Sequence, residues 1–320
     1  MRRTSLLAVL IVLALSAGSA DAQIRLPGAL GRAAGRVASS FNVGSLTERP
    51  PITTSLDDAR WADPSRDGFT PAASARSLME LERTPNGGFV LRPGYWQLTV
   101  QSYCLKAGTY GPGGGDGYLY APLRGPAEDA VMAIVRNSVQ HPEIDQRDVQ
   151  VLLWAIIARA KFEDLDARLK ATAGRLLTPR QLAGLNRNAL DLVPGDEMGA
   201  LMNRVPGPLQ QVVEAEANLR RMLTEPGATF EQMERAAVLA GVAPVGPGSR
   251  DIPSGRWSLH PDGYYVRYVP TGYTSTVVDV WVPEGSEAAG REFDPATHIA
   301  VPGNTARQRL IQSGREYRDG

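Results

Sequence analysis

The stretch that decides the fold is GYWQLTVQSYC, residues 94–104, in which apolar and polar side chains alternate. Alternation with a period of two is typical of a β-strand with one buried face. The more apolar face carries the cysteine and consists of Trp96, Leu98, Val100, Ser102 and Cys104. We therefore expect a strand here whose last side chain, Cys104, points into a core.

A second decisive stretch, VQVLLWAIIA, occupies residues 149–158. It is apolar almost all round and predicts a buried helix. Asp145 stands just before it, where its side chain can cap the amide of Asp148. Gln150 is the one polar side chain in the stretch. Because burying a carboxamide without partners costs roughly 2–7 kcal/mol, we expect a hydrogen-bonding partner for Gln150, most simply backbone or solvent.

Cys104 is the sole cysteine, which excludes an intrachain disulfide framework and multi-cysteine metal sites. Three roles remain for it. It can be an inert buried thiol, it can form an intermolecular disulfide, which the inward register disfavours, or it can be a nucleophile with His141. The last role requires an activating base or a helix N-terminus, which a strand does not offer. The histidines, His141, His260 and His298, are too scattered for a metal-binding motif, so no metal or cofactor is expected.

Composition excludes several classes of protein. Lys and Arg total 34, as do Asp and Glu, so there is no basic surplus for binding nucleic acid.

The N-terminus has Arg2 and Arg3, an apolar run at residues 6–15 and an Ala-Asp-Ala site at residues 20–22. This pattern is typical of a signal peptide cleaved before Gln23. We expect an exported protein, periplasmic, secreted or on the cell surface, without an integral membrane segment after cleavage.

Taken together, Tyr103-Cys104-Leu105, a Gly-rich loop followed by Tyr118, and the helix entry Val149-Gln150-Val151-Leu152-Leu153-Trp154 resemble the thioester domains of bacterial surface adhesins. In that family an aromatic-Cys-aliphatic strand precedes a helix that begins Thr-Gln-x-Ala-Ile-Trp. The resemblance covers residues 94–160. Val149 stands where that family has Thr, and Leu152-Leu153 stand where it has Ala-Ile.

The resemblance implies that the Cys104 sulfur and the Gln150 side-chain carbonyl join in an internal thioester. It also implies that aromatic side chains shield this bond from water, for which Tyr103, Tyr118 and Trp154 are the candidates. Such a bond captures a primary amine on a protein or glycan-associated surface ligand. The reaction is a single covalent attachment rather than enzymatic turnover.

The expected fold is α+β, with an antiparallel β portion, a helical portion and a small C-terminal antiparallel β module. We divide the chain into a signal peptide (1–22), an irregular linker or strap (23–90), a thioester-like α+β domain with a helical extension (91–245), and a C-terminal β module with its tail (246–320). Helices are expected within residues 127–241. The charged tail from residue 307 is expected to fray.

A rival hypothesis is a non-covalent envelope protein in which Cys104 is only packed. Its C-terminal strands would bind a polysaccharide or a protein through their aromatic side chains, Tyr264, Tyr265, Tyr268, Tyr273 and Trp281. Aromatic residues are also common in strands for packing reasons alone. The sequence leaves the oligomeric state and the identity of the partner open.

Overall fold

The computed structural model describes residues 50–318 except 54, 67, 114 and 191–206. The expected signal peptide and residues 23–49 lie outside the described residues. The helices are α3 (Glu128–Gln140), α4 (Gln146–Ile157), α5 (Ala167–Leu176), α6 (Pro179–Arg187), α8 (Gly207–Thr224) and α9 (Phe230–Ala237). Short 3-10 helices are η1 (Leu56–Asp58), η2 (Pro64–Arg66), η3 (Leu78–Glu80), η4 (Phe162–Asp164) and η5 (Pro295–Thr297).

The longer strands are β3 (Gly94–Cys104), β5 (Tyr118–Pro122), β8 (Tyr265–Pro270), β9 (Ser275–Val282), β11 (His298–Pro302) and β12 (Leu310–Glu316). The shorter ones are β1 (Arg76–Ser77), β2 (Phe89–Val90), β4 (Thr109–Tyr110), β6 (Val238–Leu239), β7 (Trp257–Leu259) and β10 (Glu292–Phe293). The fold is therefore mixed helix and sheet, as the sequence predicts.

The six longer strands close into an antiparallel barrel. The pairing runs from β3 to β12, β11, β5, β8 and β9, and β9 returns to β3. β3 makes closure feasible because its 11 residues are long enough to pair with β9 along one edge and with β12 near the end of the other. β1 and β7 extend the sheet beyond this ring, β1 parallel to β3.

Side chains on the two faces of the barrel strands pack in two separate hydrophobic cores. One face belongs to a core rich in aromatic and branched residues that fills the barrel, including Trp96, Val100, Cys104, Tyr118 and Leu310. The opposite face packs in a second core with the helices, including Tyr103, Leu119, Val301, Ile311 and Trp154. Cys104 is fully buried, in the first core.

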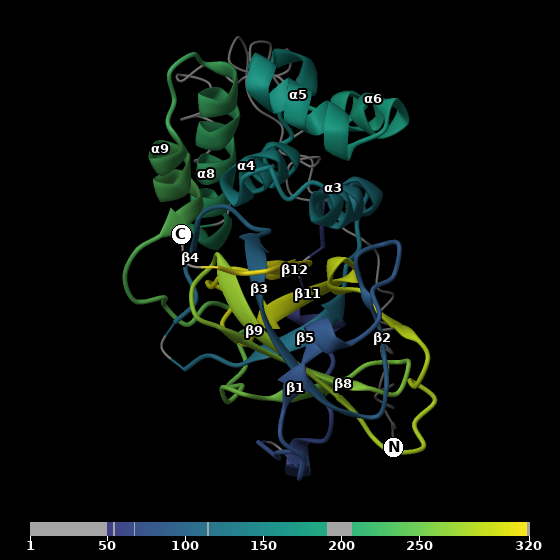
Figure 1. Ribbon diagram of the computed structural model, residues 1–320. Helices are drawn as coiled ribbons and strands as arrows, with labels where there is room; N and C mark the ends of the chain where they lie inside the picture. The colour runs from purple at the N-terminus through teal and green to yellow at the C-terminus, as the bar shows by residue number, and fades with distance from the viewer. Residues whose placement is uncertain (1–49, 54, 67, 114, 191–206, 319–320) are drawn as a thin grey trace, which may run out of the picture. The chain divides into compact units, whose positions relative to one another are not determined.

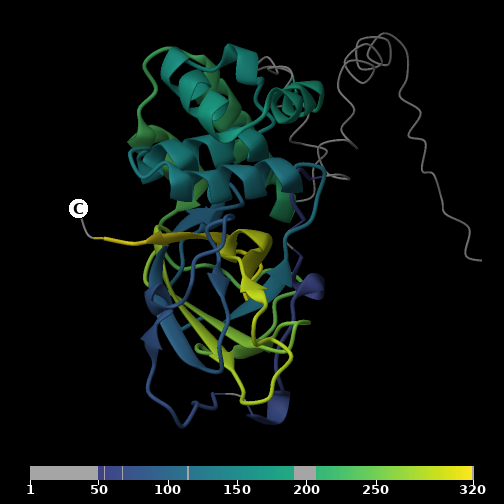
Figure 2. The same ribbon diagram turned by 45° about the vertical axis from the view of Figure 1, so that its right-hand side comes forward.

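The helices gather on one side of the barrel, as Figures 1 and 2 show. α3 contacts β12, and α4 contacts the end of β3, so α4 meets the strand that carries Cys104. The N-terminus of α4 is capped by Asp145, which accepts from the amide of Arg147 rather than from that of Asp148. This placement brings the first turns of α4 over the end of β3.

The expectation of a separate C-terminal β module is wrong. β9 and β12 both pair with β3, and β11 pairs with β5, so the strands after residue 246 complete the same barrel as the strands before it. The tail expected to fray forms β12, in which Leu310 and Ile311 are fully buried. Leu310 packs in the barrel core, and Ile311 packs in the core shared with the helices. The charge pattern of the segment does not reveal that β12 pairs with β3 and β11.

Residues 50–90 act as a strap across the β portion rather than as a free linker. Leu56, Leu78 and Leu81 are buried, β1 pairs with β3, and β2 pairs with β10. Among the described residues, no helix has the length and apolar character needed to cross a membrane.

Candidate functional site

The structure brings Cys104 and Gln150 into direct contact. The backbone N–H of Cys104 donates to Oε1 of Gln150 at 2.8 Å, and Nε2 of Gln150 donates to the Cys104 carbonyl at 3.2 Å. Both residues are buried, with at most 2% of their surface exposed. The carboxamide that the sequence singles out thus has its partner, which is the backbone of the sole cysteine.

This contact arises where the neighbouring strand ends. β9 pairs with β3 as far as Gln101, and the amide of Ser102 still bonds the carbonyl of Thr274. Beyond that point no strand occupies this edge of β3 in the described structure, and two glutamines one helical turn apart on α4 replace it. Gln150 bonds Cys104, while Nε2 of Gln146 donates to the carbonyls of Ser102 and Thr274 at 3.1 and 2.7 Å.

A cavity of about 660 Å³ opens beside Gln150. Gln150 forms part of its wall, together with Phe230 and Glu234 of α9 and Tyr273 of the turn between β8 and β9. Cys104 is not among the lining residues. A molecule in the cavity would therefore meet the Gln150 side chain before the sulfur.

Glu234 and Tyr273 form a hydrogen-bonded pair in this wall, with the tyrosine hydroxyl donating to Oε1 of the carboxylate. Burial raises the pKa of the Cys104 thiol well above its ordinary value, and the charge of Glu234 raises it further. The pKa of Tyr273 is also raised, first by burial and then by its bond to Glu234. The resting thiol is therefore protonated.

Sequence reasoning missed Glu234 as a site residue and placed Tyr273 only among the strand aromatics. The available signal was helical spacing, because Glu234 lies four residues after Phe230 and so shares its face of α9. What the sequence cannot show is that this face meets α4.

The three expected shielding aromatics are all buried, but they occupy different places. Trp154 stacks on Phe230, with ring centroids 5.5 Å apart, behind the cavity wall. Tyr103 lies in the same helix-side core, and its hydroxyl donates to Oε1 of Gln101 at 3.0 Å. Tyr118 lies inside the barrel, in the core that contains Cys104.

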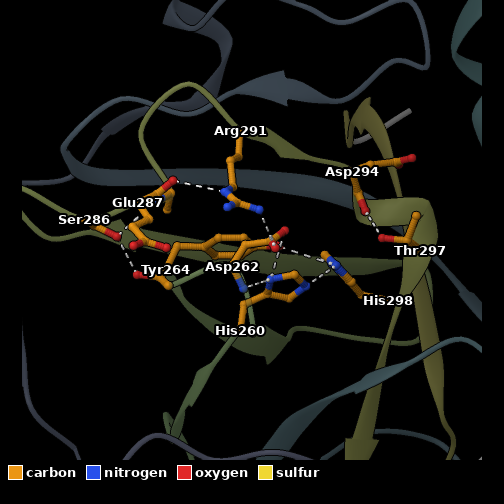
Figure 3. A network of polar contacts seen from close by, with 11 residues as sticks. His260, Asp262, Tyr264, Ser286, Glu287, Arg291, Asp294, Thr297 and His298 are labelled. Atoms are coloured by element: carbon orange, nitrogen blue, oxygen red, sulfur yellow. Dashed lines mark hydrogen bonds and ion pairs between the residues drawn. The ribbon is translucent and has the colours of Figure 1, made fainter.

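Two of the histidines meet, although they are far apart in sequence (Figure 3). Nε2 of His260 lies 3.1 Å from Nε2 of His298, and the Tyr264 ring stacks on His260 with centroids 4.3 Å apart. The Asp262 amide donates to Nδ1 of His260, so the His260 proton is on Nε2 and is donated to His298. His141 contacts Glu143 instead of Cys104.

The histidine pair is neutral at pH 7. Burial lowers the pKa of His260 to about 4 and lowers that of His298 well below its ordinary value. No cluster of three metal-ligating side chains occurs among the described residues. Since the shared hydrogen bond uses both Nε2 atoms, we assign the pair to packing.

The aromatic set of the C-terminal strands does not form one binding surface. Tyr264 and Tyr268 are buried in the barrel core. Tyr265 and Trp281 stack on each other at 5.2 Å and also pack against Phe69. Tyr273 lines the cavity beside Gln150. These side chains therefore lie in three different environments.

No protein-family model matches the chain, and neither a curated protein nor a solved structure matches it.

Proposed function

We propose that Cys104 and Gln150 form an internal thioester through which the protein captures a primary amine on a partner, a protein or a glycan-associated surface ligand. The observation that carries the proposal is the contact of the Gln150 carboxamide with the Cys104 backbone at both of its polar atoms. The N-terminal pattern of the sequence supports export, which places the partner in the periplasm, outside the cell or on its surface.

Bond formation is an acyl transfer within the chain. Sγ of Cys104 attacks Cδ of Gln150, the C–S bond forms, the C–N bond breaks, and the thiol proton leaves with ammonia. Negative charge develops on Oε1 of Gln150 during this step. The Cys104 N–H already donates to that oxygen at 2.8 Å, so it acts as the stabilising donor without further rearrangement of the backbone.

Capture reverses the roles of nitrogen and sulfur. An amine entering the cavity attacks Cδ, the new C–N bond forms, the C–S bond breaks, and the amine proton passes to sulfur. A thiolate leaves far more easily than an amine because its conjugate acid has a pKa of about 8.5, so the amide product is stable. Water must be kept from the thioester until then. Gln150 is only 2% exposed, and Phe230, which stacks on Trp154, lies in the cavity wall with it.

Intact-mass measurement on the purified protein tests the proposal. Loss of ammonia makes the wild type about 17 Da lighter than the mass calculated from the sequence of the purified chain, starting at its observed N-terminal residue. Reaction with methylamine then brings the protein to about 14 Da above that calculated mass. Cys104→Ala and Gln150→Ala have full mass and do not react. After digestion, the methylamine adduct is located on Gln150.

Gln146→Ala is the matched control. Gln146 lies one turn before Gln150 on the same helix and also bonds the β3 edge, but its hydrogen bonds go to the carbonyls of Ser102 and Thr274. This variant keeps the mass deficit. A wild type of full mass, with a thiol that alkylates on unfolding and no methylamine adduct, contradicts the proposal and favours a non-covalent binding protein with an inert cysteine.

A further inference from the structure

One carboxylate lies in the wall of the cavity beside Gln150 and is not part of the sequence pattern described above. Within the described part of the chain, Glu234 is the charged group whose field acts on the Cys104 thiol. It lines the same cavity as Gln150 and accepts a hydrogen bond from Tyr273. The carboxylate, the hydroxyl and the Gln150 carboxamide thus line one cavity, contributed by α9, the turn before β9 and α4. The carboxamide in turn bonds the backbone of Cys104 at the end of β3.

Packing of α9 fixes this carboxylate in place. Thr229 and Gln232 form a reciprocal cap at the first turn of the helix. Phe230 then stacks on Trp154 of α4, and Glu234 lies one turn further on the same face. Arg147 of α4 covers the Phe230 ring at 4.9 Å and pairs with Glu231 at 3.3 Å. Arg147, which also lines the cavity, is therefore engaged by Glu231, whereas Glu234 bonds Tyr273.

The chemistry needs a group of this kind. A thiol buried at this depth is protonated and a poor nucleophile, because the thiolate is the reactive form. An alkylamine is likewise protonated near neutral pH, because its pKa is about 10. Both steps of the thioester reaction therefore require a proton acceptor in the cavity.

We propose that Glu234 is the proton acceptor of the thioester reaction, held by the Tyr273 hydroxyl, and that it selects cationic alkylamines such as a lysine side chain. This inference rests on the function proposed above. During bond formation Glu234 receives the thiol proton and delivers it to the departing ammonia. During capture Glu234 attracts the ammonium group, which first loses one proton to solvent in the cavity and becomes a neutral amine. Glu234 receives a second proton from this nitrogen as the C–N bond forms, and it returns that proton to the Cys104 sulfur as the C–S bond breaks.

The remaining charged groups around the cavity are engaged elsewhere. Glu143 bonds Arg175 and His141, Asp145 caps α4, and Arg318 pairs with Glu316. Arg315 donates to the carbonyls of Ile144 and Pro142. Glu234 is thus the carboxylate of this wall that is bonded to a neutral hydroxyl rather than to a cation or a helix end.

The rate of methylamine capture by the full chain, followed by mass spectrometry, tests this inference. Glu234→Gln slows capture about 100-fold, which is within the range for a general base. Glu143→Gln, which changes a carboxylate of the same cavity that bonds Arg175, captures at the wild-type rate. Added formate restores part of the rate in Glu234→Ala, and it has no effect on Glu143→Ala. Tyr273→Phe retains capture but lowers its rate.

The outcomes separate the two proposals. If the wild type forms the thioester and Glu234→Gln, folded by circular dichroism, captures at the same rate, the role of Glu234 is overturned while the thioester function stands. Slow capture that formate does not restore in Glu234→Ala also overturns it, because a purely structural defect gives this result. A wild type without a thioester overturns both proposals.

Discussion

At the scale of single residues, a side-chain amide takes the place of a missing strand. Gln150 satisfies the N–H and the C=O of Cys104 on the edge of β3 that β9 no longer covers. A carboxamide suits this position because it offers one donor and one acceptor with nearly the spacing of a peptide group. The same contact that stabilises the edge holds the Gln150 carboxamide beside the cysteine.

Gln150→Met should therefore destabilise the fold even when no thioester can form. In a Cys104→Ser background, Met keeps the length of the side chain but leaves two buried backbone groups without partners. We expect the free energy of unfolding to fall by about 2–4 kcal/mol. Urea denaturation of the two proteins measures the difference, and a change below about 0.5 kcal/mol would show that the contact contributes little.

Several residues of the site could be predicted from sequence. Strand alternation places Cys104 in a core, and the apolar surroundings of Gln150 mark it as a buried carboxamide that needs a partner. Glu234 and the His260–His298 pair could not be found in this way. Their roles depend on which faces of α9, β11 and the β7–β8 connection meet other elements, and local periodicity carries no information about those meetings.

At the scale of elements, β12 is the strand that closes the barrel between β3 and β11. The charged character of residues 307–320 predicts that this segment frays, yet Leu310 and Ile311 are fully buried. The helices of residues 127–241 were easier to predict, since their amphipathic spacing and proline boundaries are local. No local sequence pattern indicates that β9, β11 and β12 pair with strands much earlier in the chain.

Removal of β12 should abolish folding rather than trim a tail. A chain that ends at residue 307 loses the fully buried Leu310 and Ile311 and leaves edges of β3 and β11 unpaired. We expect it to be insoluble or to lack a cooperative unfolding transition. A chain that ends at residue 318 is the control and unfolds like the full chain. A cooperative transition in the shorter chain would contradict this closure.

At the scale of the whole molecule, the buried histidine pair should make stability depend on pH. The unfolded histidines have a pKa of about 6.5, whereas burial lowers that of His260 to about 4 and that of His298 further below normal. Below pH 6.5 the unfolded chain binds protons that the folded chain does not. Stability is therefore full above this pH and falls as the pH decreases toward 4.

Between pH 6.5 and 5 the free energy of unfolding should fall by about 1.5 kcal/mol for each of the two histidines. Denaturant titrations at the two pH values measure this loss. His298→Gln should remove about half of it. An identical pH dependence in the wild type and His298→Gln would show that the pair is not kept neutral by burial.

The central claim concerns the chemical state of one sulfur, and titration of its thiol tests that claim most directly. The chain holds one cysteine, so the unfolded protein can show no more than one thiol. The account predicts no titratable thiol in wild-type protein unfolded at mildly acidic pH, and one thiol per chain after prior treatment with methylamine. One thiol per chain before any treatment, with no adduct on Gln150 afterwards, would contradict it.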